Sequence, residues 1–161
     1  MTSGLSVRIR RPRAAEFAAD ADATATMYLA ARRAMLPDLR DPHTEAETRA
    51  WMRDTVFTRY SVRLAEVDGE IAGFAARDGA WLMQLYVKPG LTGRGIGTQL
   101  VRDMLADAAF ATPVLRLHTF ARNAGARRFY ERHGFVAVAF GDGTGNPEGE
   151  PDVRYERNTR N

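Results

Sequence analysis

Short stretches of alternating apolar and polar residues predict strands in the first half of the chain. Residues 7–11 alternate in this way, and Pro12 ends the stretch. Three further stretches lie between residues 61 and 87, separated by Asp68-Gly69 and Asp78-Gly79. Such dipeptides favour tight hairpin turns. The region 61–87 therefore predicts an antiparallel three-stranded meander.

Other stretches carry apolar residues at helical spacing. The first runs from about residue 22 to 36 and stops before Pro37. A second begins at Thr44, which forms a capping-box pair with Glu47. A third has one apolar face made of Ile96, Leu100, Val101, Met104, Leu105 and Ala108. We therefore expect helices at all three places.

The last third of the chain alternates between strands and one more helix. Residues 114–120, 135–140 and 153–156 predict strands, and a polar, glycine-rich loop covers 141–151. A helix at 123–133 has Asn123 as its N-cap and Gly134 as its left-handed C-terminal residue. Together the patterns predict one α/β (α+β) domain over 1–161, with a mixed sheet of about seven strands and helices on both faces. The parallel strands joined through the glycine-rich helix are the natural place for a ligand.

Composition narrows the chemistry. The chain has no cysteine, which excludes disulfides and cysteine nucleophiles. Its three histidines, His43, His118 and His133, are scattered, so no metal site is expected. The net charge is +3, and the arginines alternate with acids instead of clustering, so no nucleic-acid partner is expected. Without a signal-like or membrane-spanning apolar run, we expect a cytoplasmic protein and no membrane partner.

The segment 92–98 places glycines between a predicted strand and a helix. Free amides and partial positive charge at a helix N-terminus favour a phosphate, and glycines let it approach. The segment lacks the Gly-Lys-Ser/Thr ending of a P-loop and the context of a dinucleotide fingerprint. It predicts a diphosphate site, and the simpler interpretation is a tight loop in which glycines only permit close packing.

Two segments carry a family resemblance. Residues 85–100, which include Gly93-Arg94-Gly95-Ile96-Gly97-Thr98, closely resemble the acyl-CoA-binding motif of the GNAT superfamily of N-acyltransferases. Residues 123–135 look like the next element of that family. The resemblance implies a GNAT-like, mostly antiparallel sheet and acetyl-CoA as co-substrate. It also implies transfer of an acetyl group to a primary amine of a small molecule or peptide, by direct attack. Homodimers are common in this family, so one is possible here.

The resemblance also implies roles for particular residues. Main-chain amides around the glycine-rich turn would hold the diphosphate: Gly93, Arg94, Gly95, Ile96, Gly97 and Thr98. The pantetheine arm would lie where two parallel strands splay apart, along the backbone of Leu85, Tyr86 and Val87. Asn123 would face this arm, or serve only as a cap. Tyr130 would give a proton to the leaving thiolate, or be only a packed core tyrosine. The amide near Leu85 would stabilise the oxyanion.

The general base is the open question, because the predicted strand 81–87 has no acid and Gln84 is its nearest polar residue. The candidates are His118, His43, an ordered water, or the late-loop acids Glu148, Glu150 and Asp152. The acids also suggest a cationic acceptor. The missing strand carboxylate leaves an alternative function, that of a non-catalytic acyl-CoA-binding regulatory domain.

Overall fold

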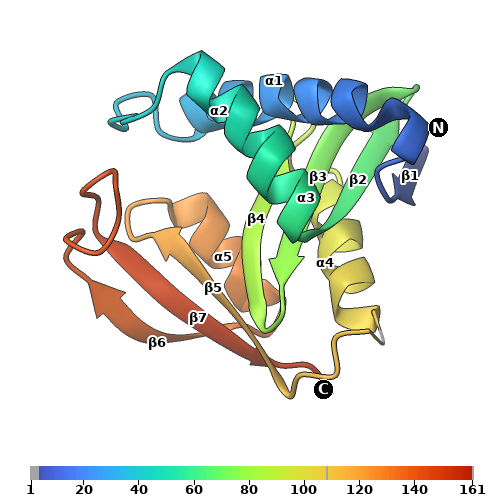
Figure 1. The fold of residues 1–161 in the computed structure, drawn as a ribbon. Coiled ribbons are helices and arrows are strands. Elements are labelled where there is room, and N and C mark those ends of the chain that lie inside the picture. The colour runs from blue at the N-terminus through green and yellow to red at the C-terminus, as the bar shows by residue number, and fades with distance from the viewer. Residues whose placement is uncertain (1–3, 108, 161) are drawn as a thin grey trace.

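The computed structural model describes residues 4–107 and 109–160, which contain one seven-stranded sheet (Figure 1). Its strand order is β1-β2-β3-β4-β5-β7-β6. The strands are β1 (Val7–Arg10), β2 (Ser61–Val67), β3 (Glu70–Asp78), β4 (Trp81–Val87), β5 (Val114–Phe120), β6 (Val136–Gly141) and β7 (Asp152–Asn158). Only β4 and β5 are parallel; every other neighbouring pair is antiparallel. The predicted mixed, mostly antiparallel sheet is confirmed.

Helices cover both faces of the sheet, as predicted (Figure 1). One face carries α1 (Phe17–Met35), preceded by the short turn η1 (Ala14–Glu16), and α2 (Glu45–Trp51), which continues as η2 (Met52–Val56) and α3 (Phe57–Arg59). The other face carries α4 (Ile96–Ala106) and α5 (Ala124–Arg132). Successive strand residues point to opposite faces of the sheet. Leu64 and Phe74 therefore pack in the core on the α1 side, and Ala65 and Ala75 pack in the core on the side of α4 and α5. None of the described helices is long and apolar enough to cross a membrane.

Several predicted ends of elements are confirmed. Thr44 and Glu47 form the capping box of α2, and the side chain of Asn123 accepts from the Ala126 amide at 3.1 Å. Gly134 takes the left-handed conformation, with φ +86°. The predicted hairpin turn at Asp68-Gly69 has two residues with positive φ, 52° and 77°. Ala108, the last apolar position predicted for α4, lies outside the described residues.

Two boundaries differ from the prediction. The second hairpin turn lies one residue later, at Gly79-Ala80, because Asp78 still pairs with Trp81. Helix α1 begins at Phe17 instead of residue 22. Its early start suits an alanine-rich segment of high helix propensity. It also places Asp20 where its carboxylate accepts from the Arg13 amide at 3.2 Å.

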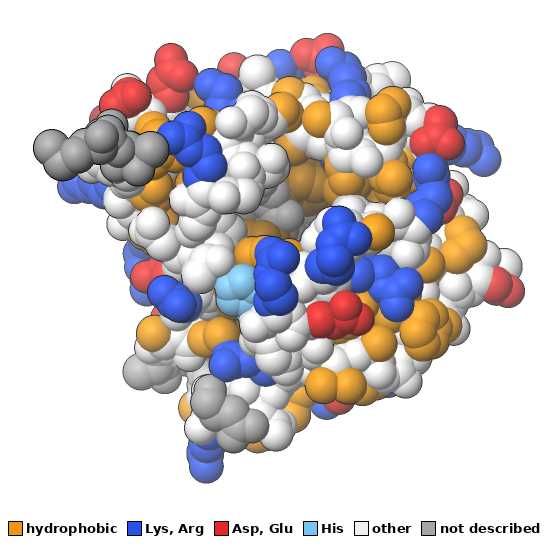
Figure 2. Space-filling view, turned by 180° about the vertical axis from the view of Figure 1, so that it is seen from behind, with side chains coloured by type: hydrophobic (Ala, Val, Ile, Leu, Met, Phe, Trp, Pro, Cys, Tyr) orange, Lys and Arg blue, Asp and Glu red, His pale blue; other side chains and the backbone are white. Residues whose placement is uncertain are grey.

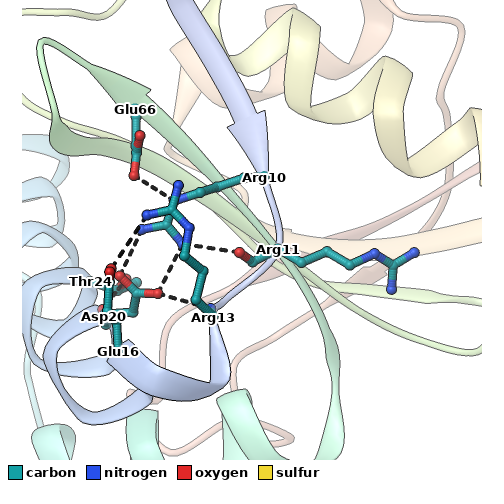
Figure 3. A network of polar contacts seen from close by, with 7 residues as sticks. All are labelled: Arg10, Arg11, Arg13, Glu16, Asp20, Thr24 and Glu66. Carbon is teal, nitrogen blue, oxygen red and sulfur yellow. Dashed lines mark hydrogen bonds and ion pairs between the residues drawn. The ribbon is translucent and has the colours of Figure 1, made fainter.

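A buried ion-pair network joins β1, α1 and β2 (Figure 3). Arg10 of β1 donates two hydrogen bonds to the Asp20 carboxylate, at 2.7 and 2.9 Å, and a third to Glu66 of β2. The side chains of Arg10 and Asp20 are 9% and 7% exposed, so the charges are largely removed from water. Buried charges of this kind need each other's hydrogen bonds, and the network therefore fixes the position of α1 on the sheet.

Candidate active site

Strands β4 and β5 are paired only where they begin. Trp81 is opposite Arg116, and the Arg116 amide donates to the Ala80 carbonyl at 2.7 Å. On the other side of β4, Ala76 pairs with Gln84 and Arg77 with Leu82, so Met83 is the extra residue of a β-bulge. A bulge bends its strand and increases its twist. The bulge therefore accounts for the gap between β4 and β5 in the described chain. No pattern in the sequence predicted this bulge.

The backbone of β4 has a definite orientation at this gap. The Lys88 amide donates to the Ala72 carbonyl at 2.8 Å, toward β3. Alternate residues of a strand direct their amides to opposite sides. The backbone groups of Leu85 and Val87 consequently face the gap, whereas those of Tyr86 face β3. Tyr86 contributes its side chain instead, which contacts Tyr28 with ring centroids 4.9 Å apart.

The gap continues into a cleft between β4, α4 and α5, with a volume of about 640 Å³. We call it the β4–α4 cleft. Its lining includes nine of the ten residues predicted to bind the co-substrate: Leu85, Tyr86, Val87, Gly93, Gly95, Ile96, Gly97, Thr98 and Asn123. Arg94 is exposed and is not part of the lining. On the side of the molecule opposite to the view of Figure 1, basic side chains lie around a hollow with hydrophobic walls (Figure 2).

The glycine-rich turn presents free amides to the cleft. Gly93 and Gly95 have φ of +74° and +90°, which side-chain-bearing residues rarely adopt. The Gln99 amide, which donates to the Gly95 carbonyl at 3.1 Å, makes the first hydrogen bond of α4. The amides of residues 96–98 thus have no partner within the helix. An anion can bind there by main-chain contacts alone.

Packing also constrains this turn. A Cβ atom on Gly97 would lie 3.2 Å from the ring of Phe129, so the glycine allows α4 to approach α5 closely. The Ile96 side chain is 1% exposed and belongs to the core, which leaves only its backbone for a ligand. The Thr98 hydroxyl lies 2.9 Å from Nε2 of His133 and connects the two helices. Close packing and anion binding are therefore both served by the same turn.

A second, smaller cavity of about 240 Å³ lies on the other side of the gap, between β4, β5, α1 and the loop before β7. We call it the β4–β5 chamber. It shares Met35, Leu85, Tyr86, Asn123, Ala126 and Tyr130 with the cleft. A ligand in the cleft and a second ligand in the chamber would therefore meet at these residues.

Tyr130 lies at this junction. Its ring is held by Phe129 and Phe135, with centroid distances of 5.4 and 5.6 Å. Its hydroxyl has no hydrogen-bond partner among the described residues. Burial is the main cause that raises the pKa of Tyr130, with a smaller contribution from Tyr86. The phenol is therefore protonated at neutral pH and free to donate to a ligand.

The chamber also contains charged groups that come from distant parts of the chain. Arg32 of α1 donates to Glu148 at 3.2 Å and to the Tyr28 hydroxyl at 2.9 Å. Asp152 and His118 lie on the neighbouring strands β7 and β5. The sequence gave no indication of Arg32, because its role depends on a loop 116 residues further along the chain.

The candidate bases are separated by the structure. His118, Glu148 and Asp152 line the chamber, as does Gln84. Glu150 instead accepts from Arg122, outside the lining. His43 is largely exposed and lies 3.9 Å from Glu47, and it lines neither the cleft nor the chamber.

Comparison with known proteins agrees with this geometry. Residues 25–135 match the model of the acetyltransferase (GNAT) family. The chain therefore belongs to that family, and it is an acyltransferase that uses acetyl-CoA as its co-substrate. No curated protein matches the chain in sequence.

Solved structures share the fold. An N-acetyltransferase from Staphylococcus aureus Mu50 is 19% identical, with a TM-score of 0.73 over 96% of this chain and 99% of that chain. PaiA N-acetyltransferase from Thermoplasma acidophilum, solved with coenzyme A, is 17% identical, with a TM-score of 0.69 over 96% and 99%. YncA from Salmonella typhimurium, solved with acetyl-CoA, is 18% identical, with a TM-score of 0.71 over 95% and 94%.

Proposed function

We propose that this chain acetylates a primary amine that carries further positive charge, by direct attack of the amine on acetyl-CoA. The observation that most supports this proposal is the junction of the cleft and the chamber at Tyr130. There a buried, protonated phenol without a protein partner lies between the cleft and an acid-lined chamber. The contributing side chains span Arg32 to Asp152, so we treat residues 1–161 as one acyltransferase domain.

The cleft fits a long ligand with a diphosphate at one end. The diphosphate binds the main-chain amides of the turn that line the cleft, from Gly93, Gly95, Ile96, Gly97 and Thr98. The pantetheine arm pairs with the free backbone edge of β4 at Leu85 and Val87, beside the Tyr86 ring. Asn123 supports this arm through its amide nitrogen, since its carbonyl oxygen is occupied by the Ala126 amide.

The residues at the junction assist the formation of the carbon–nitrogen bond and the cleavage of the carbon–sulfur bond. The neutral amine forms a carbon–nitrogen bond with the acetyl carbonyl carbon, and the Leu85 amide donates to the developing oxyanion. When the carbon–sulfur bond breaks, its electron pair goes to sulfur, and Tyr130 donates a proton to the thiolate. The product amide keeps one hydrogen on its nitrogen. An ammonium substrate therefore loses two protons. One balances the proton that Tyr130 gives to the thiolate, and the other is released to solvent.

The acceptor class follows from the charges in the chamber. Glu148 compensates Arg32, whereas none of the described arginines or lysines forms an ion pair with Asp152. The chamber thus carries excess negative charge, which raises the local concentration of cations. A second ammonium on the acceptor is stabilised there, beyond the amine that reacts at Tyr130.

The proposal is tested by measuring thiol release with acetyl-CoA and pairs of amines that differ only in one added ammonium group. We expect kcat/KM to favour the dicationic member. Glu148→Gln removes one negative charge from the chamber, so it should raise the KM of the dicationic member about tenfold and that of the monoamine less. The Tm of this variant is measured as well, because Arg32 loses its counter-charge. Asp142→Asn, in the same loop but outside the chamber lining, is the matched control.

Equal use of both amines, or equal effects of Glu148→Gln on both, would contradict the acceptor class. Tight acetyl-CoA binding without thiol release on any amine would favour the regulatory alternative instead.

A further inference from the structure

We propose that His118 is the general base, taking the proton from the acceptor's ammonium, with Asp152 and Trp81 holding its ring. This inference rests on the proposed function and deepens it, since the acetyl transfer needs a neutral amine. No acid on β4 is available for the task, because the strand from Trp81 to Val87 contains none.

Two contacts orient the imidazole, whose side chain is 53% exposed. Its ring stacks on the indole of Trp81, with centroids 5.1 Å apart and planes inclined by 5°. Its Nδ1 lies 3.7 Å from Oδ2 of Asp152, an ion-pair distance once the ring is protonated. Since Nδ1 faces β7, Nε2 is the nitrogen left to accept a proton, directly or through one water.

The other acids of the chamber suit the role less well. Glu148 forms the ion pair with Arg32, whose side chain is only 12% exposed. Protonating Glu148 would leave that buried guanidinium without its counter-charge, which is costly. Asp152 already faces Nδ1 of His118 at 3.7 Å and serves to orient the imidazole. Imidazole is also the side chain most often used for proton transfer in catalysis.

Charged side chains from β5 and β7 lie around His118. Asp152 on β7 faces its Nδ1 at 3.7 Å. Arg154 on β7 is directly opposite His118 in the strand register and lies 3.8 Å from Glu156. Arg116, on the same face of β5, is neutralised by Glu156 at 3.1 Å. Glu148 lines the same chamber and is paired with Arg32.

The proton balance is complete. The ammonium gives one proton to Nε2 of His118 before attack, and His118 returns it to solvent after product release. The nitrogen's second proton balances the one that Tyr130 gives to the thiolate. No oxidant, metal or other reactant is required.

The test is the pH dependence of kcat/KM, measured with the best amine for wild type, His118→Gln and the matched control Arg116→Gln. We expect His118→Gln to lose about 100-fold at neutral pH, the usual contribution of a general base. The deficit should close at high pH, where the amine arrives neutral without help. Arg116→Gln should follow the wild-type profile.

A second measurement separates a catalytic role from a structural one. His118→Ala should keep its acetyl-CoA affinity and regain activity when imidazole is added. A deficit in His118→Gln that stays constant with pH, or no rescue of His118→Ala, would overturn the assignment. If wild type acetylates no amine at all, it is the proposed function that fails; if only the two His118 results fail, the base lies elsewhere.

Discussion

At the scale of single residues, the side chain of Asn123 can have two roles, as a helix cap and as a ligand contact. Its carbonyl oxygen accepts from the Ala126 amide and caps α5. Its amide nitrogen has no partner among the described residues and lies where the cleft and the chamber join. The two interpretations offered by the sequence, a cap or a ligand contact, are therefore compatible.

These two roles can be tested with two substitutions. Asn123→Asp keeps an oxygen for the cap but removes the donor, so we expect an unchanged Tm and an acetyl-CoA Kd raised about tenfold. Asn123→Ala loses both, and its Tm should also fall by roughly 2–4 °C, as expected for about 1 kcal/mol. Thermal unfolding and calorimetric titration separate the cases. An unchanged Kd in Asn123→Asp would restrict the residue to capping.

At the scale of elements, periodicity and caps predicted every major helix and strand of the structure. Those signals are local: the capping box at Thr44 and the left-handed Gly134 depend on residues within one turn. The glycine-rich turn and Tyr130 were likewise identified from contiguous motifs, and they lie at one cleft.

What the sequence could not predict depends on contacts between distant segments. The bulge at Met83 exists only relative to the register of β3. Gly73 shows the same limit: a Cβ atom there would lie 3.0 Å from the Tyr86 carbonyl oxygen and 3.1 Å from Ile96. Its lack of a side chain lets α4 rest on the sheet beside the cleft. Nothing near Gly73 in sequence indicates that helix.

At the scale of the whole molecule, the Arg10 network couples α1 to the sheet. Helix α1 also supplies Arg32 and Met35 to the chamber, so its placement bears on the site. Hydrogen bonds from Arg10 are the main cause that holds the pKa of Asp20 below its ordinary value. A carboxyl with a depressed native pKa stabilises the fold above its unfolded pKa of about 3.9 and loses that contribution as pH falls.

We therefore expect Asp20→Asn to lower the free energy of unfolding by roughly 2 kcal/mol at pH 7. The difference from wild type should shrink as pH falls below about 4, where the wild-type carboxylate is protonated as well. Urea unfolding at several pH values measures it. Asp54→Asn removes an exposed ion pair with Arg53 and should have no measurable effect. A difference that does not change with pH would contradict the role assigned to this network.

The most direct test of the central claim compares thiol release by wild type and Tyr130→Phe, with acetyl-CoA affinity measured for both. Tyr60→Phe is the matched control, since Tyr60 packs in the other core and lines neither the cleft nor the chamber. We predict that Tyr130→Phe binds acetyl-CoA as wild type does but turns over about 100-fold more slowly, because the thiolate leaves without its proton donor. A Tyr130→Phe enzyme as fast as wild type would show that the junction of the two cavities is not where the thiolate is protonated.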